Sequence, residues 1–297
     1  MIRAENLSKH FEKFVALEHV TCTIDDGCIY GMVGSNGAGK STFLRTISGV
    51  YKPDGGSVFI DEQPVWDNPK VKGLIAYIPD ELYFLNNASM DRMAVMYQSI
   101  YPQFDMAKYR KLAKTLELDT KKSLNSFSKG MKRQAGTILA LATQPKYLFF
   151  DETFDGLDPV MRNFIKGLIC EDVYDRGVSA IITSHSLREL EDMCDQLALL
   201  HKGGLVVESD IQDLKTVQFK IQVAFTDDYD QSRFEGIEIS HFSKQGSVAN
   251  MIVRGDRQSV VERLKAMNPT VLDVLPLSLE EVFTYEMETL GYTFHIE

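Results

Sequence analysis

A glycine-rich stretch decides the fold of this chain: Gly34-Ser35-Asn36-Gly37-Ala38-Gly39-Lys40-Ser41. It lies between an apolar run at 29–33 and the apolar residues Phe43, Leu44 and Ile47, whose spacing predicts a helix. Glycines let the backbone turn so that successive N–H groups point at an anion, with the positive end of the helix behind them. The stretch therefore predicts a buried strand, a phosphate-binding loop and a helix.

The polar side chains of this loop predict a nucleotide with its metal ion. In the pattern G-x-x-x-x-G-K-[ST], Lys40 reaches the β- and γ-phosphates and the Ser41 hydroxyl holds Mg²⁺. Thr42 can donate a further hydroxyl to a phosphate. The alternative is a glycine-rich turn that matches the pattern by chance, and the strand before it and the helix after it argue against that.

Length and charge narrow the class of protein. A chain of 297 residues with 44% apolar residues is long enough for two domains with cores of their own. The formal charge of −10 argues against nucleic acid as a partner, because a nucleic-acid-binding protein needs basic residues opposite the phosphates. Much of the negative charge lies in the last third of the chain, which predicts a different kind of surface there.

Cysteine usage and hydropathy predict a cytoplasmic protein. The four cysteines form neither a C-x-x-C pair nor a cluster with histidine, so we expect buried thiols in a reducing compartment and no zinc site. The first residues lack the layout of a signal peptide, and no run approaches the roughly 18 apolar residues of a membrane span. We therefore expect a chain that does not itself cross a bilayer.

The periodicity of apolar residues predicts an α/β domain over residues 1–208. Alternation at 2–24 predicts short strands, and a helical period from 89 to 142 predicts an inserted helical subdomain at about 86–143. Buried strands at 147–150 and 178–183, separated by a helix at 161–174, predict a parallel sheet. Ser186 and Glu189 have the spacing of a capping box at a helix start.

The pattern changes after Gly203-Gly204 and predicts a small α+β domain over residues 209–297. Strands are expected at 217–225, 237–242, 248–253 and 271–275, with a helix at 256–267. A last helix is expected to open at Ser278, with Glu281 in capping-box position.

Two carboxylates follow the apolar strand at 147–150. Asp151 is predicted to stand at the carboxyl edge of the sheet, where open α/β sheets bind ligands, and to supply a second ligand for the metal. The adjacent Glu152 can face the γ-phosphate and polarise a water. Ordinary helix capping is the alternative for such a pair, and the phosphate-binding loop makes it the weaker interpretation.

The glycine-rich loop and three further motifs together resemble the ATP-binding cassette (ABC) ATPases. Residues 151–159, Asp-Glu-Thr-Phe-Asp-Gly-Leu-Asp-Pro, resemble the Walker B motif and D-loop of that family. Residues 127–134, Phe-Ser-Lys-Gly-Met-Lys-Arg-Gln, resemble the signature motif, and Thr183-Ser184-His185 resembles the switch histidine. The resemblance implies a P-loop NTPase of the ABC cassette type, with an inserted α-helical subdomain and a small α+β C-terminal domain.

The resemblance also implies a nucleotide held between two cassettes. Ser128 and Gly130 would sit at a helix N-terminus that faces the γ-phosphate bound by the other subunit, and Asp158 of the D-loop would join that site. Lys129 replaces the first glycine of the signature and is expected to point to solvent, although a place near the phosphate is the alternative.

Three further residues are assigned through the same resemblance. His185 would contact the γ-phosphate or the attacking water, and Phe11 would stack on adenine, with Phe14 as a neighbouring candidate. Asp80 stands where the family commonly has a glutamine near Mg²⁺. It can ligate the metal through oxygen, but an ionised carboxylate donates no hydrogen bond.

We therefore expect the ATP-binding and ATP-hydrolysing subunit of an ABC transporter, an ATPase that uses Mg²⁺. It would pair with a second cassette, as a homodimer or heterodimer, and drive a separately encoded membrane permease, in the direction of export. Its place would be the inner face of the cell membrane. The alternatives are a nucleotide-gated regulatory subunit with little hydrolysis, motivated by Asp80 and Lys129, and a soluble cassette ATPase without a transport role.

Overall fold

The computed structural model describes residues 1–211, 218–275 and 277–289. The chain divides into two compact units, Met1–Glu208 and Ser209–Glu297.

The first unit begins with an antiparallel sheet. Its strands lie in the order β2-β1-β4-β5 and comprise β1 (Ile2–Phe11), β2 (Phe14–Ile24), β4 (Gly55–Ile60) and β5 (Gln63–Pro64). Alternate residues of β1, such as Ile2 and Ala4, are buried, because successive side chains of a strand point to opposite faces of the sheet.

The second sheet of this unit has a parallel centre. Its order is β10-β9-β3-β8-β7-β6, with β3 (Ile29–Val33), β6 (Ile75–Ile78), β7 (Tyr147–Asp151), β8 (Ser179–Ser184), β9 (Gln196–His201) and β10 (Gly204–Asp210). Strand β3 runs parallel to β8 and β9, and β7 runs parallel to β6 and β8. Every residue of β3, β7 and β8 is buried, as expected of a parallel sheet that is covered on both faces.

Neither β9 nor β10 is among the predicted strands. The apolar part of β9 is short and closely follows a helix, so periodicity alone does not separate it from a buried helical segment. It pairs with β3 in the middle of the sheet and thereby supports the strand that leads into the phosphate-binding loop.

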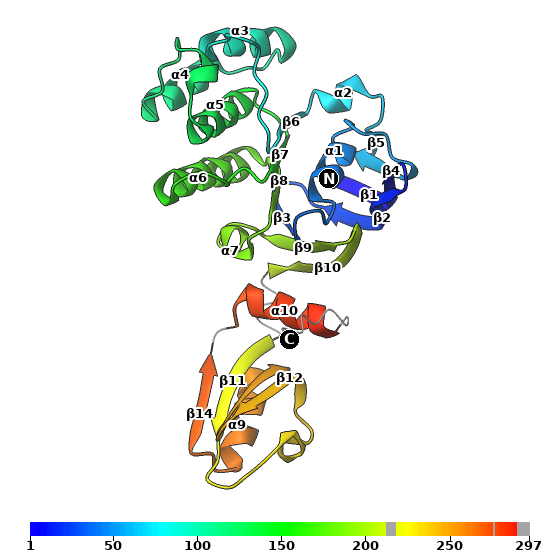
Figure 1. Cartoon of the computed structure of the whole chain (residues 1–297), viewed down its shortest axis with the longest axis vertical. Coiled ribbons are helices and arrows are strands. Elements are labelled where there is room, and N and C mark those ends of the chain that lie inside the picture. Colours follow the sequence, from blue (N-terminus) through cyan, green and yellow to red (C-terminus); the bar gives the residue numbers. More distant parts are fainter. Residues whose placement is uncertain (212–217, 276, 290–297) are drawn as a thin grey trace. The chain divides into compact units, whose positions relative to one another are not determined.

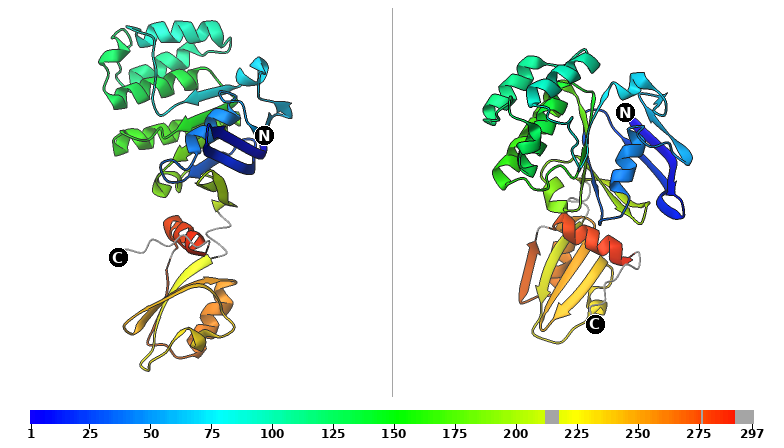
Figure 2. Two further views of the ribbon diagram at one scale, coloured as in Figure 1. Left: turned by 45° about the vertical axis from the view of Figure 1, so that its right-hand side comes forward. Right: turned by 45° about the horizontal axis from the view of Figure 1, so that its top comes forward.

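Helices cover the two faces of the parallel sheet unequally. The helical subdomain contains α3 (Met90–Ile100), α4 (Met106–Thr115), the 3₁₀ turn η1 (Leu124–Ser126) and α5 (Lys129–Ala142). Figures 1 and 2 show these helices on one side of the parallel sheet, and the antiparallel sheet with α1 (Lys40–Ile47) on the other. Short α2 (Pro69–Lys72) precedes β6, α6 (Pro159–Arg176) follows β7, and α7 (Leu187–Leu190) follows β8.

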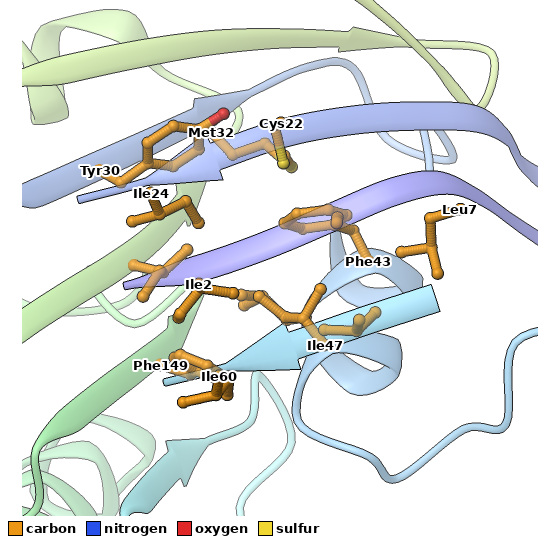
Figure 3. Close-up of a cluster of buried hydrophobic side chains, with 14 of the residues drawn as sticks. Ile2, Leu7, Cys22, Ile24, Tyr30, Met32, Phe43, Ile47, Ile60 and Phe149 are labelled. Carbon is orange, nitrogen blue, oxygen red and sulfur yellow. The ribbon is translucent and has the colours of Figure 1, made fainter. Parts of the chain in front are cut away.

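The core of this unit lies between the two sheets and surrounds α1. Phe43 and Ile47 of α1 are fully buried among side chains of β1 and β3, which include Leu7 and Met32 (Figure 3). Full burial of an apolar side chain of this size stabilises a fold by about 1.5–3 kcal/mol. The core therefore fixes the start of α1, which is Lys40, directly behind the glycine-rich loop.

One of the two predicted capping boxes forms. Ser278 Oγ accepts a hydrogen bond from the amide of Glu281, and a carboxylate oxygen of Glu281 accepts one from the amide of Ser278. The prediction for Ser186 and Glu189 is wrong: Ser186 makes no side-chain cap, and Glu189 instead accepts a hydrogen bond from Ser184 Oγ at 2.7 Å. A tertiary partner outcompetes the local one there.

The second unit is an antiparallel sheet with helices. The sheet has the order β12-β13-β11-β14, formed by β11 (Gln218–Ala224), β12 (Glu238–Gln245), β13 (Val248–Arg254) and β14 (Val271–Leu275). The 3₁₀ turn η2 (Gln231–Phe234), α9 (Arg257–Ala266) and α10 (Leu279–Thr289) complete it. The strands and helices match the predicted ones apart from shifts at their ends, the largest in β12, which ends at Gln245 instead of residue 242. The turn η2 was not predicted, and Val217 lies outside the described residues.

The sheet of the second unit packs on both faces. Met251 and Val253 share one buried cluster with Leu264 of α9, whereas Ile252 between them packs with Leu277 and Val282 of the α10 segment. Within the described part of the chain, no helix has the length and apolar character that spanning a membrane requires.

Candidate active site

The glycine-rich loop joins β3 to α1 in a space that side chains would fill. A Cβ at Gly34 would lie 2.3 Å from the carbonyl oxygen of Leu200. Gly39 has a φ of 110°, and a Cβ there would lie 2.5 Å from the carbonyl oxygen of Ala16. Gly39 also caps α1 without any side-chain hydrogen bond, so the positive end of this helix is left for an anion.

A cavity of about 450 Å³ lies beside the loop. Its volume falls in the range of small-molecule sites, which is about 300–1,000 Å³. The lining residues come from the start of β2, the loop with the start of α1, and the segments that follow β6 and β7: Phe14, Ala16, Asn36, Gly37, Ala38, Gly39, Lys40, Ser41, Thr42, Asp80, Glu152 and Asp155. Residues 36–42, all predicted to bind a nucleotide, are therefore grouped in one place with Glu152, whereas Gly34 and Ser35 are not among the lining residues.

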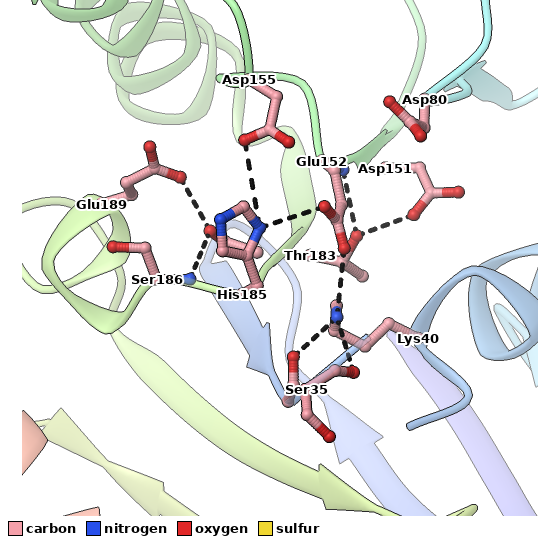
Figure 4. Close-up of polar contacts among 12 residues, drawn as sticks. Ser35, Lys40, Asp80, Asp151, Glu152, Asp155, Thr183, His185, Ser186 and Glu189 are labelled. Carbon is pink, nitrogen blue, oxygen red and sulfur yellow. Dashed lines mark hydrogen bonds and ion pairs between the residues drawn. The ribbon is translucent and has the colours of Figure 1, made fainter. Parts of the chain in front are cut away.

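Lys40 is a buried cation in this cavity. Its side chain is 4% exposed, and its Nζ donates to the carbonyl oxygen of Gly34 at 2.7 Å and to that of Ser35 at 3.2 Å. Nζ also lies 3.1 Å from Oε1 of Glu152 (Figure 4). Because a buried charge is costly without partners, these oxygens hold the ammonium group at the base of the loop.

The Asp151 carboxylate, at the end of β7, is fully buried and surrounded by hydroxyl groups. Its Oδ1 accepts hydrogen bonds from Ser41 Oγ and Thr183 Oγ1, each at 2.9 Å, and its Oδ2 accepts one from Tyr77 at 3.0 Å. Burial raises the pKa of Tyr77, and the charge of Asp151 raises it further, so the phenol stays protonated and donates. The oxygens of Asp151 and Ser41 are hard donors of the kind that Mg²⁺ requires, so these residues fit a magnesium site.

Glu152 links Lys40 to His185. Its backbone has a φ of 46°, a left-handed conformation that non-glycine residues seldom adopt, directly after the end of β7. With Oε1 at Lys40, its Oε2 lies 3.2 Å from Nδ1 of His185. Asp155 lies 4.0 Å from the same imidazole nitrogen. A carboxylate held between a lysine and a histidine can polarise a water molecule that enters the cavity.

The predicted site residues at the starts of α5 and α6 do not line this cavity within one copy of the chain. Ser128 is exposed and caps α5 by accepting from the amide of Met131 at 3.2 Å. Asp158 is exposed and caps α6 by accepting from the amide of Met161 at 2.9 Å. Gly130, in the first turn of α5, is not among the lining residues either, and Lys129 beside it is exposed, as expected.

The aromatic residue at the cavity is Phe14, whereas Phe11 was the predicted one. Phe11 packs edge to face against Tyr51, with 5.3 Å between the ring centroids. Phe14 lines the cavity and is 60% exposed. The two residues pair across the β1–β2 turn, so their spacing in the sequence does not indicate which ring reaches the loop.

Asp80 lines the cavity, but its carboxylate has a partner other than the one predicted. Its Oδ1 accepts a hydrogen bond from Nη2 of Arg133 on α5 at 2.5 Å. In Figure 4, Asp80 lies apart from the contacts that join Lys40, Glu152 and His185. The ion pair with Arg133 therefore competes with the predicted role of the Asp80 carboxylate as a metal ligand.

Sequence reasoning missed Tyr77, Thr183 and Arg133. The first two lie at the carboxyl ends of β6 and β8, on either side of β7, and Thr183 pairs with Asp151 in the sheet register. Polar residues at the ends of strands that flank a catalytic strand are the signal that could have found them. Arg133 gives no such signal, because a basic residue on a helix normally reads as part of a solvated face.

The fold and this site define a P-loop nucleotide-binding protein. The family model for the ABC transporter matches residues 17–155. The ABC transporter ATP-binding protein YtrB of Bacillus subtilis (strain 168) is 32% identical over 283 residues, which cover 95% of this chain and 97% of YtrB. The bacitracin transport ATP-binding protein BcrA of Bacillus licheniformis is 30% identical over 224 residues, covering 72% of this chain and 71% of BcrA.

A comparison with solved structures also indicates an ABC transporter ATP-binding protein. The ATP-binding subunit of an ABC transporter superposes with a TM-score of 0.67 and 26% identity, over 72% of this chain and 92% of that one. The chain belongs to the family of ABC transporter ATP-binding proteins. It is an ATP-binding and ATP-hydrolysing subunit, and the predicted family, fold class and ATPase activity are confirmed.

Proposed function

We propose that ATP binds in the cavity beside the loop, with its phosphates against Gly37, Gly39, Lys40 and Thr42. The observation that carries this proposal is the position of Glu152, whose two carboxylate oxygens contact Lys40 and His185 at 3.1 and 3.2 Å. Residues from three separate elements thus meet at the point where a terminal phosphate would lie. The remaining loop residues Gly34, Ser35, Asn36 and Ala38 shape the anion cradle.

We assign the metal site to Ser41 and Asp151. Mg²⁺ bound there would neutralise charge on the phosphates during transfer. Tyr77 and Thr183 orient the Asp151 carboxylate through their hydroxyl groups, so that its direction is fixed before any ligand arrives.

We assign the chemistry of hydrolysis to Glu152 and His185. Glu152 accepts a proton from the attacking water as general base, and His185 holds the carboxylate in place through its Nδ1 and contacts the γ-phosphate or the water. Phe14, at the mouth of the cavity, is the aromatic ring that we expect against the adenine.

We further propose that two cassettes enclose the nucleotide. Ser128 and Gly130 lie at the start of α5, Asp158 at the start of α6, and both N-caps are exposed in one copy. An exposed helix N-terminus attracts a phosphate brought by another molecule. These residues therefore complete the site of a second copy or of a related cassette, and Lys129 points to solvent.

The partner that uses this motion is a membrane permease encoded separately, in the direction of export. Bacitracin transport in the name of the relative BcrA supports a role of this kind. Through the permease, the chain would lie on the inner face of the cell membrane. Residues 1–208 would form the nucleotide-binding domain, and residues 209–297 an accessory domain, which the alignment with YtrB includes because it covers 95% of the chain.

The substitution Glu152→Gln tests the catalytic assignment. Loss of a general base lowers turnover by about 100-fold or more, and ATP affinity should stay within about threefold of wild type. The variant should also form an ATP-dependent dimer, measured by size-exclusion chromatography with and without ATP and Mg²⁺. Glu171→Gln, on an exposed position of α6, is the matched control. Hydrolysis that continues at the wild-type rate in Glu152→Gln would contradict the assignment.

A further inference from the structure

The segment that follows β6 is attached to α5 at two points. Asp80 Oδ1 accepts a hydrogen bond from Arg133 Nη2 at 2.5 Å. A Cβ added to Gly136, one turn further along α5, would lie 2.9 Å from Cδ2 of Leu82. Arg133 and Gly136 are three residues apart and share one face of the helix. The segment therefore contacts a single face of α5 through one ion pair and one apolar contact.

Arg133 is a buried cation that Asp80 neutralises. The Arg133 side chain is 1% exposed, whereas that of Asp80 is 46% exposed. Nη1 of Arg133 lies 3.5 Å from the carbonyl oxygen of Pro79, and its Nε has no hydrogen-bond partner among the described residues. A buried charge that loses its partner is left uncompensated, which is strongly unfavourable. The ion pair therefore fixes Asp80 to α5.

Asp80 of this pair borders two cavities. Asp80 lines the nucleotide cavity together with Lys40 and Glu152. Asp80 and Arg133 together line a second cavity of about 460 Å³, which Lys129 also borders. Lys129 is the first residue of α5, so the second cavity reaches the end of the helix that Ser128 caps. A displacement of α5 would therefore move Asp80 at the nucleotide cavity. A displacement of Asp80 would likewise move α5.

We propose that Asp80 and Arg133 form a positioning pair for ATP hydrolysis. They hold the N-terminus of α5 at a fixed place relative to the nucleotide cavity of the same chain, and the Asp80 carboxylate serves this pair instead of binding Mg²⁺. The proposal rests on the proposed function, because it has two requirements. ATP must bind beside Lys40, and Ser128 must contact the ATP that is bound by a second copy. It predicts a loss of turnover and not of nucleotide affinity.

A double-mutant cycle of Arg133→Met and Asp80→Asn tests the pair. Each single variant should lower kcat for ATP at least fivefold, with KM and the Kd for ATP within twofold of wild type. Since both substitutions break the same connection, the double variant should lose no more than the worse single variant. Lys108→Met is the matched control, because Lys108 of α4 pairs with Asp172 of α6 and so also ties the helical subdomain to a neighbouring helix. Its kcat should stay within twofold of wild type.

A second measurement needs no turnover. The backbone amides of the first turns of α5, such as that of Lys132, which donates to the carbonyl oxygen of Ser128 at 2.9 Å, should exchange hydrogen faster in both single variants than in wild type, in the absence of nucleotide. If Arg133→Met does not fold, Asp80→Asn alone can be measured. The Asp80 side chain is half exposed, so we expect this substitution to leave the fold intact.

Three results would overturn the positioning pair: unchanged exchange at these amides, a double-variant loss equal to the product of the single losses, or a Lys108→Met loss as large as that of Arg133→Met. A wild-type chain that binds no ATP at Lys40 would instead contradict the proposed function, and the exchange measurement would still decide whether the pair positions α5.

Discussion

The N-termini of α1 and α5 present the same kind of group in opposite surroundings. At α1 the cap is a glycine without a side-chain hydrogen bond, and Lys40 behind it is 4% exposed and held by Glu152. At α5 the cap is the exposed Ser128, whose hydroxyl already accepts from the amide of Met131, and Lys129 is exposed. The first end lies in the nucleotide cavity, whereas the Ser128 cap of the second end is exposed and lies outside that cavity.

This difference indicates how binding and turnover are divided. The groups that we propose to bind the triphosphate at α1 all belong to one chain, so binding should depend mainly on α1 and its neighbours. The α5 end does not line the nucleotide cavity of its own copy, so it should act only when another molecule brings a phosphate to it. Variants at the two ends should therefore separate affinity from catalysis.

The largest effect is expected at α1. Lys40→Ala removes the cation at the base of the loop and leaves Glu152 without its lysine partner. A hydrogen bond to a charged group contributes about 1.5–3 kcal/mol, and several such contacts to phosphate predict a loss of ATP affinity of at least about 100-fold. Titration with a fluorescent ATP analogue measures it. Affinity within threefold of wild type would refute the role given to α1.

A smaller effect, and one of a different kind, is expected at α5. Ser128→Ala should lower kcat about tenfold while ATP binding to the single chain stays within twofold, because Ser128 lies outside the cavity of its own copy. Loss of the cap should also lower the stability of the fold by about 1 kcal/mol. Lys129→Ala is the control and should retain turnover within twofold. If Ser128→Ala weakens ATP binding as Lys40→Ala does, the contrast between the two helices is wrong.

The smallest effect concerns the aromatic residue beside α1. Phe14→Ala should weaken ATP binding about five- to tenfold, since stacking of a base on an aromatic ring contributes about 1–3 kcal/mol. Phe11→Ala should change affinity less than twofold, because Phe11 packs against Tyr51 instead of lining the cavity. Isothermal titration with ATP and with inorganic triphosphate separates base from phosphate contacts. A larger loss of ATP affinity in Phe11→Ala than in Phe14→Ala would indicate that Phe11, and not Phe14, stacks on the adenine.

Several elements followed from local sequence alone. The loop at 34–41 is defined by its glycines and the residues beside them, and the Ser278–Glu281 capping box forms because both partners lie within one turn. The boundaries of the strands and helix in the second unit also matched the sequence periods. In each case the sequence pattern that indicates the element lies within a few residues along the chain.

Other features depended on contacts between distant residues. Glu189 accepts a hydrogen bond from Ser184 instead of capping a helix with Ser186. Tyr77 and Thr183 donate to Asp151 from the neighbouring strands. Arg133 of α5 donates to Asp80, which follows β6. The sequence by itself determined the phosphate-binding loop, the class of fold and the order of its motifs, because short-range spacing encodes backbone turns and apolar periodicity. Only the tertiary structure decided which aromatic ring lines the cavity and which cation holds Asp80, because those pairings arise when separate elements pack together.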